Sequence, residues 1–350
     1  MLTTTSNRTI LEKLTRALEM IKEYNETHNM TFLEQAETIL EEVRREDPNN
    51  LDAIFYSGKT MDLIGKPVDA KPFFERILNE AKDEHIKEEA LYNLSVSLYH
   101  QYSHKYLKEA ERKFKKLIDR TKNDVLKNLA QATLAQTYAM WMIPNSEQRE
   151  KLKTEKGKIE VFEHINKKFD SFNECETEVR KAIKKARKIF KKKSEPWKKI
   201  QAIIDNARGM ASMYYTDYLC ETDDSKREYL KESLKYLKSS DLVIPEDWAN
   251  TCDLASVHMR MSVFKRDPDA RRSEFNEAKK LLTKVVEELR PGYGFALYEL
   301  GRLHRLHGYY AESVSYFEES LSIPEEYRDV SNKTVERERD RARAKESCFP

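Results

Sequence analysis

Residues 294–324 read GFALYELGRLHRLHGYYAESVSYFEESLSIP. Apolar side chains recur every three or four positions on both sides of Gly308, which is the spacing of a helix face. Gly308 itself is typical of a turn between helices. In the second half, the small residue Ser313 precedes the large residue Phe317 by four positions. The stretch therefore predicts two short antiparallel helices that approach closely where a small side chain faces a large one.

The same small-to-large spacing recurs along the chain. It is found in Ala36-x3-Leu40, Ala70-x3-Phe74, Ala110-x3-Phe114, Ser233-x3-Leu237 and Ala278-x3-Leu282. Ala36 and Ala70 lie 34 positions apart, and Ala278 and Ser313 lie 35 positions apart. A repeat of this length is typical of a solenoid built from helix pairs. Because a solenoid presents an extended surface, the repeat indicates a binding protein.

The composition also favours helix. Charged residues make up 35% of the chain, and only 8 Gly and 10 Pro occur in 350 residues, whereas a sheet protein needs many turn residues. Hydrophobic residues make up 39%, with 18 Tyr and 14 Phe, which is enough for a packed core. The net charge of +2 provides no global field that would attract nucleic acid or lipid.

The cysteines and the chain start bear on location. Cys175, Cys220, Cys252 and Cys348 include no C-x-x-C pair, and their spacing fits neither a zinc site nor a disulfide framework. The first twenty residues lack the apolar segment of a secretory signal. No stretch is long and apolar enough to span a membrane. We therefore expect an intracellular, cytoplasmic protein.

Several segments match a known repeat pattern. They are Ile54-x2-Ser57-Gly58-x2-Met61 before Ala70-x3-Phe74, Leu91-x2-Leu94-Ser95-x2-Leu98 before Ala110-x3-Phe114, and Leu297-x2-Leu300-Gly301-x2-His304 before Ser313-x3-Phe317. In this pattern the chain resembles a tetratricopeptide-repeat (TPR) protein. The resemblance implies an all-α fold, an antiparallel helix-pair solenoid that winds as a right-handed superhelix of roughly 14–16 helices.

The match divides the chain into four parts. We expect TPR-like repeats at 1–143 and 223–325, with a divergent helical segment at 144–222 between them. The divergent segment is either a lengthened or degenerate part of the array or an inserted helical hairpin. Residues 326–350 are highly charged, which is typical of a solvated tail or of the capping helix that the end of a solenoid needs.

The resemblance implies that the first helix of each pair lines a concave groove. The positions expected to point into it are Phe55, Tyr56, Lys59, Tyr92, Asn93, Val96, Gln136, Tyr298, Arg302 and Arg305. Aromatic, amide and Arg side chains together suit peptide capture, although each alone also fits ordinary surface. Asn93 matches the central Asn of a carboxylate clamp, but Tyr56 and Thr133 stand at the equivalent turns. A chaperone-tail adaptor is therefore disfavoured.

One segment has a strong local charge. From Val179 to Lys193 there are nine basic and no acidic residues, namely Arg180, Lys181, Lys184, Lys185, Arg187, Lys188, Lys191, Lys192 and Lys193. Val179, Ile183, Ala186 and Phe190 keep helical spacing, so the run predicts an amphipathic basic helix. It is either a solvated outer face or a contact for the phosphates of RNA or DNA. A membrane surface or an acidic protein could bind it equally well.

Signals for catalysis and metal binding are weak. The chain has no phosphate-binding loop, nucleophile elbow or metalloprotease motif. His304 and His307 lie about one turn apart, but a metal site needs further ligands, for which His258 and Cys252 are the candidates. His304 stands where the repeat pattern has a packing aromatic, so a structural role is favoured. We expect no enzyme, no cofactor and no metal.

These observations favour a non-catalytic scaffold or adaptor that binds a protein or peptide partner in its groove. Two alternatives remain. One is an RNA-binding helical-repeat protein that uses the basic helix at 179–193. The other is a regulatory subunit that senses a peptide or effector for an enzyme on another chain.

Overall fold

The computed structural model describes residues 2–27, 29–101, 103–189, 195–220, 222–325 and 330–345. These residues form sixteen α-helices and one short π-helical turn, and they contain no strand. The chain divides into two compact units, Met1–Asp119 and Arg120–Pro350, which are described separately. This division differs from the four parts expected from the sequence, which stay a prediction.

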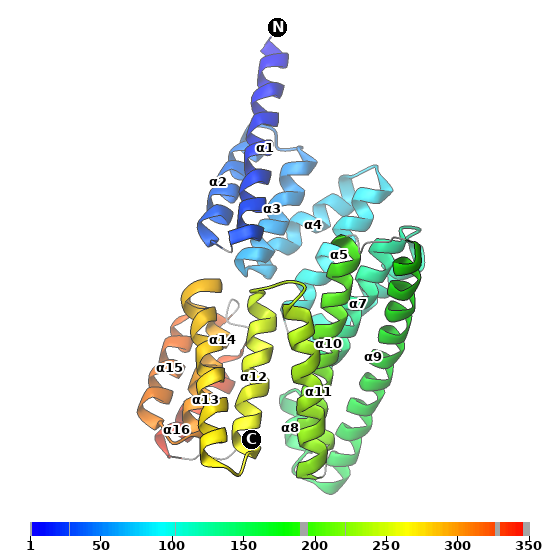
Figure 1. Cartoon of the computed structure of the whole chain (residues 1–350). Helices are drawn as coiled ribbons and strands as arrows, with labels where there is room; N and C mark the ends of the chain where they lie inside the picture. Colours follow the sequence, from blue (N-terminus) through cyan, green and yellow to red (C-terminus); the bar gives the residue numbers. More distant parts are fainter. Residues whose placement is uncertain are drawn as a thin grey trace. The chain divides into compact units, whose positions relative to one another are not determined.

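The first unit consists of three consecutive pairs of helices (Figure 1). They are α1 (Leu2–Thr27), α2 (Met30–Glu46), α3 (Leu51–Ile64), α4 (Pro67–Glu80), α5 (Glu84–Tyr99) and α6 (His104–Arg120). The side chains of Asn29 and Asn50 accept hydrogen bonds from backbone N–H groups of α2 and α3, which fixes where these helices begin. Gly65 ends α3 at φ 89°, the left-handed C-cap conformation that favours glycine.

Small-to-large packing joins the first helix of a pair to the second. Phe74 on α4 is fully buried and lies against Gly58 on α3. A Cβ atom at Gly58 would come within 2.9 Å of the Phe74 ring, so the two helices approach closely only because Gly58 has no side chain. The spacing of Ala70 and Phe74 correctly predicts this contact face.

The second unit continues the series. Its helices are α7 (Asp124–Trp141), α8 (Ser146–Lys151), α9 (Glu155–Ile189), α10 (Glu195–Leu219), α11 (Asp223–Asp241), α12 (Trp248–Phe264), α13 (Pro268–Lys284), α14 (Gly294–Leu306), α15 (Tyr310–Ser322) and α16 (Asn332–Arg343). The pairs are α7 with α9, α10 with α11, α12 with α13, and α14 with α15. The turn Val285–Leu289, which extends α13, is π-helical and was not expected from the sequence.

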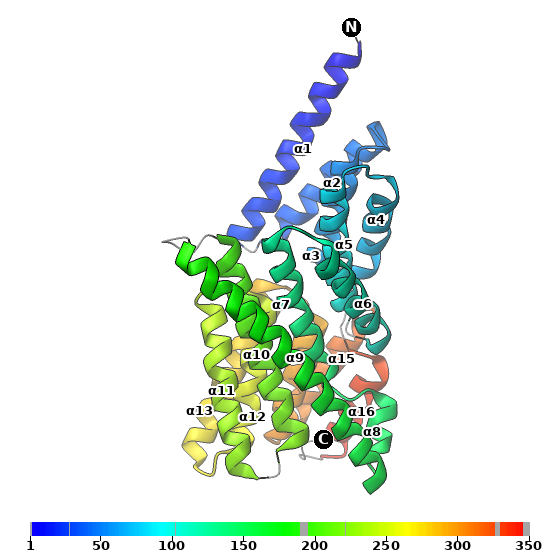
Figure 2. The same cartoon turned by 90° about the vertical axis from the view of Figure 1, so that its right-hand side faces the viewer.

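The divergent segment is part of this series. Long helix α9 packs as the second helix of one pair, α10 is the first helix of the next, and the short helix α8 lies in the connection between α7 and α9 (Figure 2). A Cβ atom at Gly209 on α10 would come within 2.5 Å of Leu237 on α11. The segment therefore packs against the helices on either side of it in the chain, α7 and α11, and the two alternatives for its origin stay predictions.

The array ends in a covering helix. Helix α16 packs on α15 and also contacts α14, and it buries Val335, Glu338 and Ala342. The described part of the charged tail therefore includes a helix packed on the last pair, and the expected division at 326 stays a prediction. Together these pairs give the predicted all-α, TPR-like fold of antiparallel helix pairs packed in series.

Candidate functional site

The first helices of the second unit lie next to one another. We call the surface formed by α7, α10, α12 and α14 the first-helix wall. A row of amides crosses it, because Gln136 Nε2 donates to Asn206 Oδ1 at 2.8 Å, and Asn206 Nδ2 donates to Asn250 Oδ1 at 3.1 Å and to Asp253 Oδ2 at 3.0 Å. The row connects three successive first helices by side-chain hydrogen bonds alone, which fixes their register.

Asp253 is the titratable member of this row. Burial raises the pKa of its carboxyl from 3.8 to about 7, although the hydrogen bond from Asn206 acts in the opposite direction. The charges of Asp247 and Glu299 raise the pKa further, whereas Arg260 lowers it. Asp253 therefore changes its charge near neutral pH.

Four charged side chains follow the amide row along the wall. We call Asp217, Arg260, Glu299 and Arg302 the charge cluster. Arg260 on α12 is 5% exposed and holds Asp217 on α10 with three hydrogen bonds, from Nε to Oδ1 at 2.8 Å and to Oδ2 at 3.1 Å, and from Nη2 to Oδ2 at 2.6 Å. On α14, Arg302 Nη1 lies 2.6 Å from Glu299 Oε1. Ser256 Oγ donates to the other oxygen of Glu299 at 3.3 Å, which connects α12 to α14.

Two tyrosines and an arginine border the charge cluster. Burial raises the pKa of Tyr298 to about 12, and burial also raises that of Tyr218. The positive charge of Arg149 on α8 acts against burial and offsets part of both increases in pKa, so this guanidinium lies within electrostatic reach of both rings. Arg260 and Arg302 act on Tyr218 in the same way. The two phenols therefore lie among both basic and acidic groups, Arg149, Arg260 and Arg302 on one side and Asp217, Glu299 and Glu338 on the other.

The four predicted groove residues of the second unit differ in position. Gln136 belongs to the amide row, and Tyr298 and Arg302 lie at the charge cluster. Arg305 is fully buried, and its Nη2 lies 2.8 Å from Glu338 Oε2 on α16. Its role is to hold the covering helix, so it does not lie on an open face as expected.

The six predicted groove residues of the first unit lie on α3 and α5. Phe55 is buried against Phe74, with ring centroids 6.0 Å apart. Tyr56 is half-buried, and Lys59 Nζ lies within 6 Å of both the Phe55 and Tyr56 rings, at 5.8 and 5.7 Å. Tyr92, Asn93 and Val96 are half-buried on α5. Peptide binding by this set stays a prediction.

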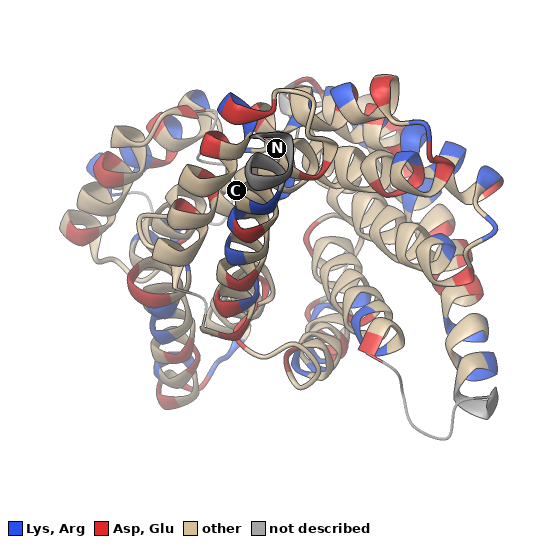
Figure 3. Cartoon of the chain, turned by 90° about the horizontal axis from the view of Figure 1, so that it is seen from above, with Lys and Arg blue, Asp and Glu red and all other residues tan. Residues whose placement is uncertain are grey.

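The basic run is less free than its sequence indicates. Arg180 pairs with Glu176 at 2.8 Å and with buried Asp205 at 3.0 Å, and Lys181 pairs with Glu178 at 2.8 Å. Lys184 and Lys185 are exposed and make no ion pair with any described residue. Arg187 and Lys188 lie in α9 without described side chains, and Lys191, Lys192 and Lys193 lie outside the described residues. Figure 3 shows basic and acidic residues interspersed over the helices.

The histidines and cysteines have structural surroundings. His304 Nδ1 contacts the Leu300 carbonyl at 2.9 Å, and His307 Nε2 contacts Ser262 Oγ at 2.8 Å. Burial raises the pKa of the Cys252 thiol well above its usual value. Within the described residues, no three His, Cys, Asp or Glu side chains are arranged to hold a metal ion, and no helix has the length and apolar character needed to cross a bilayer.

Sequence reasoning missed most of the wall. Arg149, Asp217, Tyr218, Asp253, Arg260 and Glu299 were not among the predicted site residues. One signal was present, because Asp253 and Arg260 are the only acidic or basic residues of α12 apart from His258. Isolated charges in an otherwise apolar helix indicate buried pairs. The partners themselves lie too far away in sequence to be found from it.

No family model matches the chain, and no curated protein matches it in sequence. Among solved structures, a tetratricopeptide repeat protein from Parabacteroides merdae is 12% identical, with 96% of this chain and 99% of that chain covered and a TM-score of 0.43. IFIT1, solved with m7Gppp-AAAA, is 13% identical, with coverage of 91% and 75% and a TM-score of 0.41. The TPR2AB domain of yeast Sti1, in complex with pHSP90, is 14% identical, with coverage of 85% and 98% and a TM-score of 0.29. These scores are low, so the assignment of the fold rests on the helix pairs described above.

Proposed function

We propose that this chain is a non-catalytic helical-repeat scaffold that binds an extended segment of a partner protein on the first-helix wall. The observation that carries the proposal is the charge cluster. Its members come from α10, α12 and α14, and ion pairs and hydrogen bonds hold them in fixed positions. Arg260, Glu299 and Arg302 are 5%, 1% and 9% exposed, so Asp217 is the member that reaches solvent, and Arg260 holds its carboxylate in place. A polar group that is ordered before binding costs little entropy when a ligand is bound.

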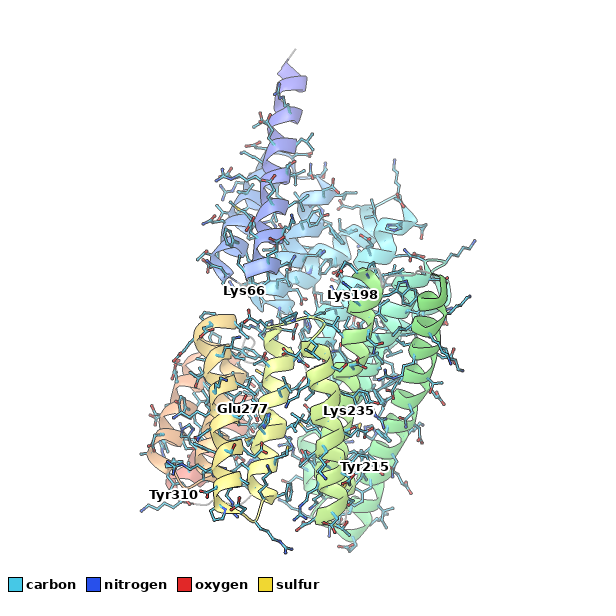
Figure 4. The ribbon with its side chains drawn as sticks, in the orientation of Figure 1. Lys66, Lys198, Tyr215, Lys235, Glu277 and Tyr310 are labelled. Carbon is cyan, nitrogen blue, oxygen red and sulfur yellow. The ribbon has the colours of Figure 1, made fainter. Side chains whose placement is uncertain are left out.

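The other faces of these helices support the choice of the wall. On α10, Tyr215 (Figure 4) lies on a different face. Its ring is tilted against those of Phe169 on α9 and Tyr229 on α11, with centroids 4.8 and 4.7 Å away. Arg208 on the same helix is held by Glu232 at 3.0 Å and by Glu176 at 3.4 Å. These groups join α10 to the second helices α9 and α11, whereas the polar groups of the wall join first helices to one another.

A charge reversal tests the proposal. The double variant Asp217→Arg/Arg260→Asp exchanges the two partners, so an ion pair can still form while the charge pattern of the wall is inverted. The matched control is Lys235→Glu, which reverses an exposed charge on the second helix α11 (Figure 4). Each full-length protein is used as bait in its native host extract, with and without nuclease, and bound proteins are identified by mass spectrometry.

We expect a protein bound by wild type and by Lys235→Glu to be lost from the double variant, and the loss to be the same after nuclease treatment. A reconstituted complex of the purified components should show the same difference. Equal binding by the double variant, provided that its thermal unfolding matches wild type, would contradict the proposal. So would the absence of any protein that binds wild type directly.

Exposed Lys184 and Lys185 favour a second function, binding of RNA by α9. If phosphates bind there, Lys184→Glu/Lys185→Glu should abolish binding of a generic single-stranded RNA, and the affinity of wild type should fall steeply as salt rises. Lys231→Glu, an exposed charge on α11, is the control. Binding that is absent, or insensitive to salt, rules this function out.

A further inference from the structure

The turn between α11 and α12 is apolar and protrudes. It begins with Leu242, Val243, Ile244 and Pro245. Leu242 is 84% exposed, more than any other large apolar side chain that the structure describes, and Pro245 is exposed as well. Turns between helices are normally polar, so four consecutive apolar residues at such a place indicate a contact with something apolar.

The conformation of this turn is fixed at both ends. The backbone N–H of Leu242 donates to the carbonyl of Lys238 on α11 at 3.1 Å. Glu246 has φ 61°, in the left-handed region that residues other than glycine rarely adopt, and its carboxylate pairs with Lys284 on α13 at 2.6 Å. Such a conformation persists only where the surroundings hold it. Leu242 is therefore held in its exposed position.

Side-chain contacts bring α9 and α11 together close to this turn. Asp205 on α10 accepts from Arg180 Nη2 on α9 at 3.0 Å and from Ser239 Oγ on α11 at 2.9 Å. The Tyr236 ring on α11 also lies 5.3 Å from Arg180 Cζ. The two second helices are therefore neighbours at the level of Asp205.

Beyond this level, both helices continue towards the same end of the unit. Arg208, about one turn after Asp205 on α10, contacts Glu176 on α9 and Glu232 on α11. Both of these acids lie earlier in their helices than the partners of Asp205, so α9 and α11 are each antiparallel to α10. Helices that are both antiparallel to a third run in the same direction.

Exposed lysines lie at the level of the turn. Lys184 and Lys185 lie about 6 and 8 Å further along α9 than Arg180, at a rise of about 1.5 Å per residue. By the same rise, Leu242 lies about 5 Å further along α11 than Ser239. We call the following four residues the basic end: Lys184, Lys185, Lys238 and Leu242. Its three lysines are exposed and make no ion pair with a described residue.

The acidic residues near the basic end do not cancel its charge. Glu246 is paired, as described above, and Asp247 caps α12 by accepting from a backbone N–H. Burial raises the pKa of Asp241, which favours its uncharged form. The exposed acids Glu287 and Glu288 lie on the π-helical turn after α13, one pair further along the array, and limit the basic surface on that side.

We propose that the basic end is a peripheral binding site for an anionic lipid surface. Leu242 enters the boundary between headgroups and acyl chains, and the three lysines contact the charged headgroups. RNA would use the same lysines, but it gains little from an aliphatic side chain, because bases stack on aromatic rings and guanidinium planes. The site lies on the second helices α9 and α11, so it does not depend on the first-helix wall.

Cosedimentation of the full chain with vesicles tests the site. The probes are vesicles of phosphatidylcholine alone and vesicles in which one third of the lipid is phosphatidylserine, both at physiological salt. The variants are Leu242→Ser and Lys184→Gln/Lys238→Gln. One control is Leu11→Ser, which changes a 64% exposed leucine on α1. The other is Lys156→Gln/Lys167→Gln, which removes two exposed lysines nearer the start of α9.

We expect wild type to bind the phosphatidylserine vesicles and to bind phosphatidylcholine alone far more weakly. Leu242→Ser should lower the partition coefficient about ten-fold. Lys184→Gln/Lys238→Gln should lower it about twenty-fold, because each cation at an anionic leaflet contributes about five-fold. Both controls should bind like wild type. In Leu242→Trp, brominated lipid should quench the added indole, which reports entry into the acyl region.

Several results would overturn the proposal. Wild type that does not bind the phosphatidylserine vesicles would do so, as would an indole in Leu242→Trp that brominated lipid does not quench. An equal loss in Lys156→Gln/Lys167→Gln would show attraction to the overall charge rather than to the basic end. Full binding by Leu242→Ser, with tighter binding of an oligouridine through Lys184 and Lys238, would identify RNA as the partner.

Discussion

Gly301 on α14 lies directly against the ring of Phe317 on α15, and a Cβ atom at Gly301 would come within 2.6 Å of Phe317 Cε1. Ser313, one turn before Phe317, donates from Oγ to the Gly301 carbonyl at 2.7 Å. In the preceding part of the unit, Ser233 Oγ donates to the Gly209 carbonyl at the same distance. The pairs α10–α11 and α14–α15 therefore share one contact. In each, a glycine on the first helix leaves room for a large side chain of the second, and a serine hydroxyl of the second helix donates to the glycine carbonyl.

Filling this contact should separate the helices. We expect Gly301→Ala to lower the free energy of unfolding of the second unit by roughly 1–3 kcal/mol, because overpacking outweighs the better helix propensity of Ala. Chemical denaturation measures the loss. Phe317→Leu also destabilises, but the double variant Gly301→Ala/Phe317→Leu should be less destabilised than the sum of the two single changes. Strict additivity would show that the two side chains do not clash.

Removing a charge from the basic run should either destabilise the protein clearly or change its stability very little, depending on whether that charge is paired. Arg180 links α9 to buried Asp205 on α10, so Arg180→Ala should cost about 2–3 kcal/mol of unfolding free energy through the unpaired carboxylate. Lys184→Ala and Lys185→Ala remove exposed cations and should change stability by no more than about 0.5 kcal/mol. Denaturant titrations of the three variants check this order. Equal effects at Arg180 and Lys184 would contradict it.

The predictable part of the fold is the part that local spacing determines. The register of Ala70, Phe74, Ser313 and Phe317 identifies the faces that pack. The ion pair of Arg260 and Asp217, by contrast, joins residues 43 positions apart on helices of different pairs. No periodicity within one helix reports such a contact. The small residue Gly209 was missed for a related reason, since the repeat pattern around it lacks the preceding leucine.

Breaking the charge cluster should be costly. Asp217→Asn leaves the guanidinium of Arg260, which is 5% exposed, without its counter-charge. We expect a loss of roughly 3 kcal/mol in the free energy of unfolding, and a double variant with Arg260→Met should recover much of it. Thermal and chemical unfolding of the single and double variants measure the coupling. If the double variant is as unstable as Asp217→Asn, the cost arises from something other than the unpaired charge.

Asp253 should make stability depend on pH. Its folded-state pKa of about 7 lies above the value of 3.8 for an unburied Asp, so the folded state binds the proton more tightly between these values. The contribution of protonated Asp253 to the free energy of unfolding is therefore fully present below about pH 4 and is lost as pH rises through 7. Asp253→Asn keeps an oxygen that can accept from Asn206 and should stabilise the protein at pH 8 by about 1 kcal/mol.

The difference between wild type and Asp253→Asn isolates this group from the other titrating residues. Burial lowers the pKa of His304 and His307, so those side chains act in the opposite sense and weaken the fold as pH falls. Both proteins share that effect, which cancels in the difference. A stability difference that is constant from pH 4 to pH 8 would show that Asp253 titrates normally.

The attachment of the covering helix α16 should depend on the carboxylate of Glu338. Glu338 on α16 is 1% exposed and pairs with fully buried Arg305 on α14 at 2.8 Å, and a second contact reaches Arg341 at 3.1 Å. Glu338→Gln leaves Arg305 charged in a site that water does not reach, so we expect a loss of about 3 kcal/mol and release of α16 before the rest of the unit unfolds. Glu336→Gln removes an exposed acid from the same helix and should change little. Hydrogen exchange followed by mass spectrometry resolves α16 from α14 and α15. Unchanged protection of 332–343 in Glu338→Gln would mean that the buried apolar residues Val335 and Ala342 hold the helix without the ion pair.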